Sequence, residues 1–111
     1  MAGLITFDAH TDSVAVSNTA FSALIPTVNF SLLLANTVQI QAYNTLDPNV
    51  CTVQLLVDGN VVVDNVLGGV PLFLNIALGS GAHTIDYKAV AVASGVTTTT
   101  RGLTVVNLGL L

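Results

Sequence analysis

Charged residues are scarce in this sequence, in which only 7% of the residues are Asp, Glu, Lys or Arg. A typical soluble domain has about 25%. Glu is absent, and Lys88 and Arg101 are the only Lys and Arg residues in the chain. Because two cations cannot form a phosphate-binding surface and the net charge is −4, we expect no binding to nucleic acid or to an anionic membrane.

Three other absences exclude further classes of protein. Cys51 is the only cysteine, so an intrachain disulfide framework is excluded. No stretch of about 18 residues is free of polar interruptions, which argues against a membrane-spanning helix. The first twelve residues have neither the basic region nor the apolar core of a secretory signal peptide, so we predict none.

The residues that are abundant favour strands. Val, Thr, Leu, Asn and Gly dominate where a helical protein would carry Glu, Lys and Arg. The strongest local signal is residues 53–65, which read as a β-hairpin. Its turn lies at Asp58-Gly59-Asn60, since an Asp-Gly step between alternating apolar residues is typical of a tight hairpin turn.

Alternating polarity and turn residues divide the rest of the chain in the same way, and no helix of about ten residues or more is expected. About eight to ten short strands with turns between them indicate an all-β antiparallel sandwich or barrel. The expected strands are 13–17, 21–25, 27–34, 37–44, 53–57, 61–65, 71–78, 82–94, 96–100 and 103–108. Residues 96–100 are expected to pair back on the long strand before them.

Residues 1–12 are predicted to form an extended N-terminal arm, followed by one β-domain over residues 13–111. The arm could pair with its own sheet or with a neighbouring copy by strand addition, and the sequence leaves both open.

The low charge predicts self-association, because soluble monomers usually keep apart through surface Lys and Glu. The outward faces of 27–34 and 37–44 carry amides and hydroxyls without a charge. Such a face suits either solvent or a polar subunit interface. The candidate assembly contacts are Leu4, Ile5, Phe7, Gln39, Gln41, Tyr43 and Cys51.

Three short patterns carry a resemblance to small jelly-roll domains of bacterial and phage surface proteins. They are Asp58-Gly59, Gly81-x-His83-Thr84 and Leu103-Thr104-Val105. In outline the chain is similar, over residues 13–108, to the trimeric jelly rolls of the tumour-necrosis-factor and complement type. The resemblance implies a jelly-roll fold for residues 13–111 and threefold assembly, and it implies no catalytic residues.

Asp8-x-His10-x-Asp12 is the one cluster of potential metal ligands. Alternate residues of a strand share a face, so all three could reach one ion, but a solvated polar linker is the favoured interpretation and we predict no metal. Residues 97–100 are four threonines, read as an exposed strand.

No catalytic constellation or cofactor motif is found either. His83 has no obvious carboxylate partner in the sequence and is expected to pack or to bond a turn carbonyl. Cys51 is in phase with buried positions, although an intersubunit disulfide is the alternative if its strand end is exposed. Asp86, Lys88 and Arg101 could form a pair between neighbouring strands. We therefore predict no enzymatic activity.

The sequence thus predicts a self-assembling structural subunit of a fibre, appendage or particle. Trimers would stack through the arm on an extracellular surface, that of a spore or a virion. The alternative is a receptor- or carbohydrate-binding tip domain. Against this alternative, sugar platforms usually need exposed aromatics, and the chain has no Trp and only two Tyr.

Overall fold

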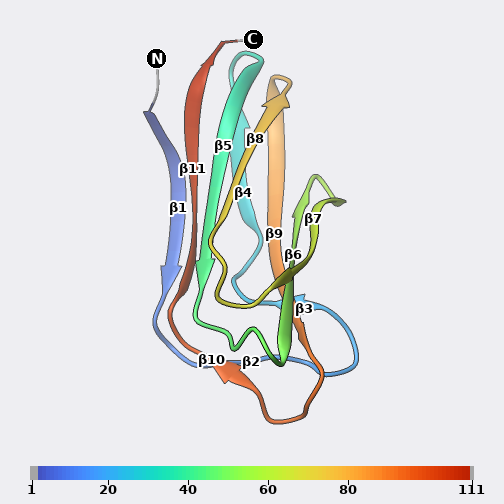
Figure 1. Ribbon diagram of the computed structural model, residues 1–111. Helices are drawn as coiled ribbons and strands as arrows, with labels where there is room; N and C mark the ends of the chain where they lie inside the picture. The colour runs from blue at the N-terminus through green and yellow to red at the C-terminus, as the bar shows by residue number, and fades with distance from the viewer. Residues whose placement is uncertain (1–2, 111) are drawn as a thin grey trace.

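The computed structural model describes residues 3–110, which form antiparallel β-sheets packed face to face (Figure 1). The strands are β1 (Gly3–His10), β2 (Val14–Ala15), β3 (Ser22–Ala23), β4 (Val28–Leu32), β5 (Asn36–Asn44), β6 (Cys51–Val57), β7 (Asn60–Leu67), β8 (Leu72–Leu78), β9 (Gly81–Ala91), β10 (Thr97–Thr98) and β11 (Arg101–Leu110). The predicted all-β sandwich is confirmed. Within these residues no helix is long and apolar enough to cross a membrane.

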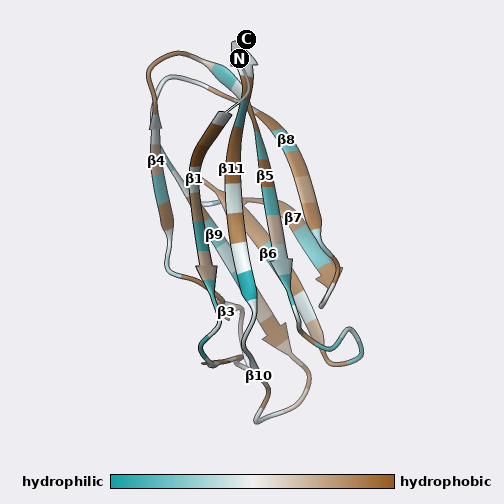
Figure 2. Ribbon diagram, turned by 90° about the vertical axis from the view of Figure 1, so that its left-hand side faces the viewer, coloured by the Kyte–Doolittle hydropathy of each residue, from teal (hydrophilic) through white to brown (hydrophobic). Residues whose placement is uncertain are grey.

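The two main sheets have the strand order of a jelly roll. One sheet has the order β1-β11-β5-β8, and Figure 2 looks onto it. In the other, β9 pairs with β6 on one side and with both β3 and β4 on the other, and β7 follows β6. The chain therefore crosses repeatedly between the sheets, at β4 to β5, β5 to β6, β7 to β8 and β8 to β9, and this double-sheet arrangement brings distant strands side by side.

The core follows from the period of two in each strand. In β5, Val38, Ile40 and Ala42 point inward and are buried, as predicted. In β6, Val53 and Leu55 meet them from the opposite sheet, and both are fully buried. The alternation of Val28, Phe30 and Leu32 predicts that Leu34 also points inward, but Leu34 is 59% exposed, because β4 ends at Leu32 and the chain turns before Leu34.

The central hairpin has the predicted turn. Val57 pairs with Asn60, so Asp58 and Gly59 are the two turn residues, and both have positive φ angles, 52° and 80°. Positive φ at both central positions is the type I′ geometry, which matches the right-handed twist of the strands.

The first strand belongs to the sandwich. β1 pairs antiparallel with β11 from Gly3 to His10, so of the two alternatives for residues 1–12 the structure has the pairing with its own sheet. Residues 3–10 are therefore the edge strand of this sheet, on the N-terminal side of the predicted boundary at residue 12. Residues 1–2 lie outside the described residues.

The threonine tract differs from its prediction. Thr97 and Thr98 form β10 and pair with β2, not with β9. Thr98 is buried, and its hydroxyl lies 3.1 Å from that of Thr45. One of the four threonines is thus buried and hydrogen-bonded to the exposed Thr45, so the tract is not simply an exposed strand.

Candidate functional site

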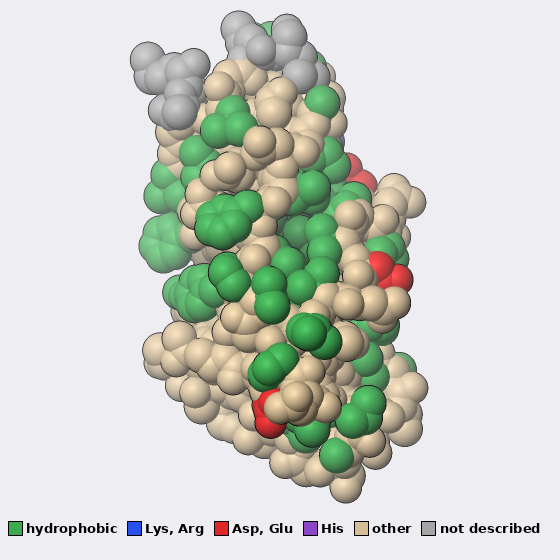
Figure 3. Space-filling view, in the orientation of Figure 1, with side chains coloured by type: hydrophobic (Ala, Val, Ile, Leu, Met, Phe, Trp, Pro, Cys, Tyr) green, Lys and Arg blue, Asp and Glu red, His purple; other side chains and the backbone are tan. Residues whose placement is uncertain are grey.

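The solvent-facing side of the sheet β1-β11-β5-β8 is the candidate site, and we call it the outer face. It comprises Leu4, Phe7, Gln39, Gln41, Tyr43, Phe73, Asn75, Thr104 and Val106. None of these nine side chains is charged. Asp8, on the same sheet, pairs with the buried Leu103 and therefore faces the inner side. The carboxylates that are visible in Figure 3 lie toward the right and the bottom of the molecule.

One row of side chains crosses all four strands of the outer face. The register pairs Phe7 with Thr104, Thr104 with Gln41, and Gln41 with Phe73. Phe7 is 63% exposed and Phe73 is 68% exposed, each on an edge strand. Neighbouring strands lie about 4.8 Å apart, so the two rings stand about 14 Å apart with a hydroxyl and an amide between them.

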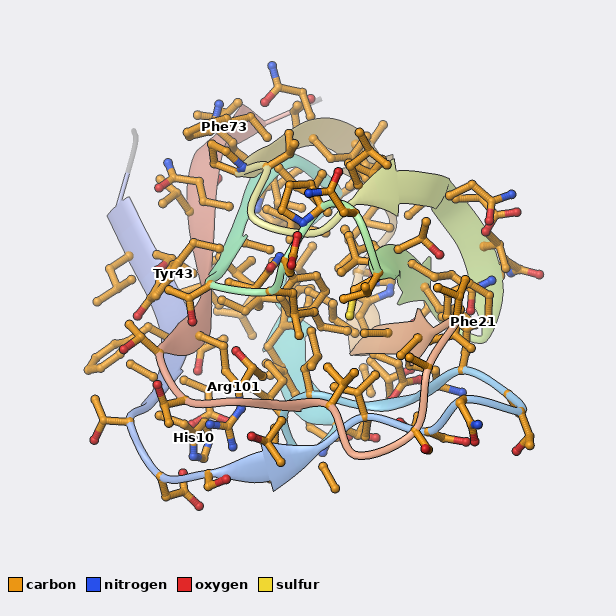
Figure 4. All side chains as sticks on the ribbon, turned by 60° about the horizontal axis from the view of Figure 1, so that its bottom comes forward. His10, Phe21, Tyr43, Phe73 and Arg101 are labelled. Carbon is orange, nitrogen blue, oxygen red and sulfur yellow. The ribbon has the colours of Figure 1, made fainter. Side chains whose placement is uncertain are left out.

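Tyr43 lies beside this row, over a glycine. Its register partner across β5 and β11 is Gly102, and a Cβ atom built there would lie 2.6–2.8 Å from the Oη, Cζ and Cε1 atoms of Tyr43. The tyrosine ring therefore rests on the Gly102 backbone, and it remains 41% exposed. Figure 4 shows Tyr43 and Phe73 on the outer side of the sheet.

We expect Gly102→Ala to lift the Tyr43 ring off the sheet, because the added methyl group takes the space of the ring. The chain has no Trp, and Tyr87, the other tyrosine, is fully buried, so fluorescence quenching by iodide reports Tyr43 alone. Quenching should increase in the variant. Gly3→Ala is the control, since nothing lies within 4 Å of a Cβ atom there, and its quenching should match the wild type. Unchanged quenching in Gly102→Ala would contradict the stacking.

Three amides form a chain along the outer face. Gln41 Nε2 donates to Gln39 Oε1 at 2.7 Å, and Gln39 Nε2 donates to Asn75 Oδ1 at 3.1 Å. Within residues 3–110, Gln41 Oε1 and Asn75 Nδ2 have no hydrogen-bond partner. The chain thus offers an acceptor at one end and a donor at the other, next to Phe73.

Five of the seven candidate assembly contacts lie on the outer face: Leu4, Phe7, Gln39, Gln41 and Tyr43. Ile5 instead packs against the core. Cys51 is 2% exposed in the core between the sheets, where burial raises the pKa of its thiol, so it occupies the predicted buried position. The assembly that these residues were predicted to make stays a prediction.

The sequence reasoning missed Phe73, Asn75 and Gly102. The outward orientation of Phe73 and Asn75 could have been predicted, because they alternate with the inward Leu72 and Leu74 of a predicted strand. The chain also has four Phe, which can serve as exposed aromatics in the absence of Trp. Gly102 carried a weaker signal, because a glycine within a strand often marks a close approach of another group.

Asp8, His10 and Asp12 do come together at one end of the sandwich. His10 Nε2 lies 2.9 Å from an Asp8 carboxylate oxygen, and Nδ1 lies 3.6 Å from Asp12. The Asp8 contact lacks hydrogen-bond geometry, so Nε2 is buried without a hydrogen-bond partner among the described residues. Among those residues no three His, Cys, Asp or Glu side chains are arranged to hold a metal ion.

Arg101 lies in the same region, next to His10 in the register, and is 3% exposed (Figure 4). Its guanidinium donates to three backbone oxygens, those of Asp12, Leu24 and Thr99, and lies 3.3 Å from the Asp12 carboxylate. The predicted pairing of Asp86, Lys88 and Arg101 was wrong, because Arg101 is drawn inward to these carbonyls. Asp86 instead accepts a hydrogen bond from the Thr27 hydroxyl.

His83 has a carboxylate partner that the sequence did not reveal. Its Nδ1 lies 2.8 Å from Asp58 in the β6–β7 turn, and its Nε2 lies 2.7 Å from the Gly79 carbonyl, the predicted turn contact. Asp58 also accepts a hydrogen bond from the Thr84 amide. The Asp58 hydrogen bond raises the pKa of His83, and the His83 hydrogen bond lowers the pKa of Asp58. His83 thereby joins the β6–β7 turn to the turn at Gly79.

Known proteins resemble this chain in fold. No family model and no curated protein matches the sequence. A family 35 carbohydrate binding module from an environmental isolate superposes with a TM-score of 0.51 at 13% identity, over 96% of this chain and 93% of that one. A structure of infectious bursal disease virus, Gx strain, gives 0.50 at 12% identity, over 96% of this chain and 32% of that one.

Identities this low show the fold alone, which is the jelly-roll β-sandwich. The predicted jelly roll is therefore confirmed. The tumour-necrosis-factor type of trimer, which the resemblance implied, is not shown by these likenesses and stays a prediction.

Proposed function

We propose that this chain is a noncatalytic carbohydrate-binding module and that its outer face is the binding surface. The observation that carries the proposal is the gathering of Phe7, Tyr43 and Phe73 around amide side chains on one uncharged face. A sugar ring has an apolar C–H face and a rim of hydroxyls. Exposed aromatic rings fit the first, and amides, which both donate and accept hydrogen bonds, fit the second.

The fold supports this proposal, since a family 35 carbohydrate binding module shares it. The chain itself supports the proposal more directly, because two large aromatic side chains are exposed to solvent. Phe7 and Phe73 are each more than 60% exposed, although burial of a phenylalanine is favourable by about 1.5–3 kcal/mol. A ligand that covers them gains this free energy. An extracellular location is part of the proposal, because polysaccharides are met there.

The test is retention of the purified chain on polysaccharides. We expect Phe7→Ala and Phe73→Ala each to weaken binding about fivefold to tenfold, since truncation of a central aromatic contact typically costs about 1 kcal/mol or more. Leu67→Ala is the matched control, because Leu67 is 52% exposed on β7 of the other sheet, and its retention should equal the wild type. Equal retention of all three variants would place the binding surface elsewhere.

The second candidate is the self-assembling subunit of a fibre, appendage or particle, for which we propose trimers on a spore or virion surface. A separate observation favours it: β1 and β8 are the edges of the sheet, and neither carries a lysine. Edge strands are usually guarded by charge, since their free backbone groups otherwise pair with another chain.

The test of self-assembly must leave β1 in place, because deletion of residues 2–11 would remove a strand of the sandwich. We expect Leu4→Lys with Phe7→Lys to convert assemblies into monomers by adding charge to the edge, as measured by light scattering after size exclusion. The control is Val61→Lys with Leu67→Lys, two exposed positions on β7, which should leave assemblies intact. A wild-type chain that is already monomeric would overturn this candidate.

A further inference from the structure

We infer that the glycan bound by the outer face is an uncharged polymer whose chain runs across the strands, along the row from Phe7 to Phe73. This inference rests on the proposed function and adds the charge, the length and the direction of the ligand.

We infer that the ligand is uncharged from the few cations that this chain has. A glycan with carboxylate or sulfate groups needs cations, and Lys88 and Arg101 are the only Lys and Arg. Arg101 is buried and already donates to backbone oxygens, while Lys88 lies on β9 of the other sheet. With a net charge of −4, the molecule repels an anionic polymer over a Debye length of about 8 Å. A neutral glycan meets neither obstacle.

The length follows from the two phenylalanines. They stand about 14 Å apart at opposite edges of the sheet, since three strand spacings separate them. This span is far wider than a single sugar ring. Only a ligand of several linked sugars touches both rings at once, and the second contact is then made at a high effective concentration.

The direction follows from what lies between the rings. Thr104 and Gln41 fill the middle of the row, with a hydroxyl and a free amide oxygen to meet sugar hydroxyls. Asn75, next to Phe73 on β8, adds a free amide donor. Tyr43 flanks the row with its ring held down over Gly102. A glycan that runs parallel to the strands would meet one of the two phenylalanines and leave the other exposed.

The experiment is calorimetric titration of the full chain with size series of oligosaccharides, from mono- to hexasaccharides. Neutral gluco-, xylo- and manno-oligosaccharides form one arm, and oligogalacturonates of the same sizes form the other. We expect affinity for one neutral series to rise about tenfold or more once the ligand spans both rings. We also expect no binding of the galacturonates.

The variants locate the effect. Phe7→Ala and Phe73→Ala should each abolish the rise with length, because one anchor is then missing, while Leu67→Ala should retain it. Galacturonate binding as tight as neutral binding, or an affinity independent of length, would overturn this inference and leave the proposed function standing. A chain that binds no member of either arm, and no neutral polysaccharide in the retention assay, would overturn both.

Discussion

Replacing Arg101 by methionine should lower the free energy of unfolding by about 1–3 kcal/mol, the usual cost when a buried hydrogen-bond acceptor loses its donor. Arg101 is 3% exposed and connects three segments, because it donates to the backbone oxygens of Asp12, Leu24 and Thr99. Methionine fills much of the volume but donates no hydrogen bond. The buried carbonyl of Leu24 then has no donor in place of the guanidinium.

Urea denaturation monitored by circular dichroism measures this loss. Lys88→Met is the matched control, since it removes the same charge from a side chain without an ion pair among the described residues. Its stability should stay within about 0.5 kcal/mol of the wild type. If Arg101→Met lowers the free energy of unfolding by less than about 1 kcal/mol, water replaces the guanidinium, and the Arg101 hydrogen bonds do not hold the three segments together.

Stability should also fall as pH rises above 6.5, because the protonated ring of His83 makes the stronger contacts with its two partners. Both ring nitrogens face acceptors, the Asp58 carboxylate and the Gly79 carbonyl, and only an imidazolium donates to both. The hydrogen bond to Asp58 raises the pKa of His83 above its ordinary value of 6.5. Its contribution is therefore complete below pH 6.5 and is lost as pH rises through the higher pKa of the folded state.

At acidic pH the dependence runs in the opposite direction, so stability falls as pH falls. The pKa of Asp58 is lowered from its ordinary value of 3.8, with the His83 hydrogen bond as the main cause. Its contribution is present above pH 3.8 and is lost as pH falls through the lower pKa of the folded state. The pair therefore stabilises the sandwich most between these two limits.

Denaturation midpoints across the pH range measure this effect, and the NMR shift of the His83 ring follows the proton itself. His83→Gln should lose about 1–3 kcal/mol near neutral pH and should abolish the alkaline decline. His10→Gln removes the other histidine and should leave the decline in place. An alkaline decline that persists in His83→Gln would show that another group causes it.

Features set by neighbouring residues were predictable from the sequence. The Asp58-Gly59 turn was predictable, because it depends on the φ angles that two adjacent residues tolerate. So was the direction of each β5 side chain, since period two needs only the local strand. The nature of the sandwich followed from the spacing of such strands, and the resemblance supplied the jelly-roll order.

Features set by distant residues were not predictable. The His83–Asp58 pair joins residues 25 positions apart, although both belonged to patterns on which the resemblance rested. The row from Phe7 to Phe73 depends on the register of four strands, and period two places a side chain on a face without giving its neighbour on the next strand. The buried position of Arg101 was not predictable, because its three carbonyl partners come from segments that no local rule connects.

The pairing of β1 with β11 has a consequence for how the chain folds during synthesis. β11 lies between β1 and β5, so the sheet stays divided until β11 has left the ribosome. Until then β1, which is synthesised before β11, has no partner strand for its backbone groups. Because the chain carries few charges, electrostatic repulsion from other nascent chains is weak. Pairing of such distant segments is slow, because the entropy cost of closing a long loop comes before any stabilising contact has formed. We therefore expect this domain to complete its fold only after β11 has emerged and to need protection from aggregation until β11 is in place.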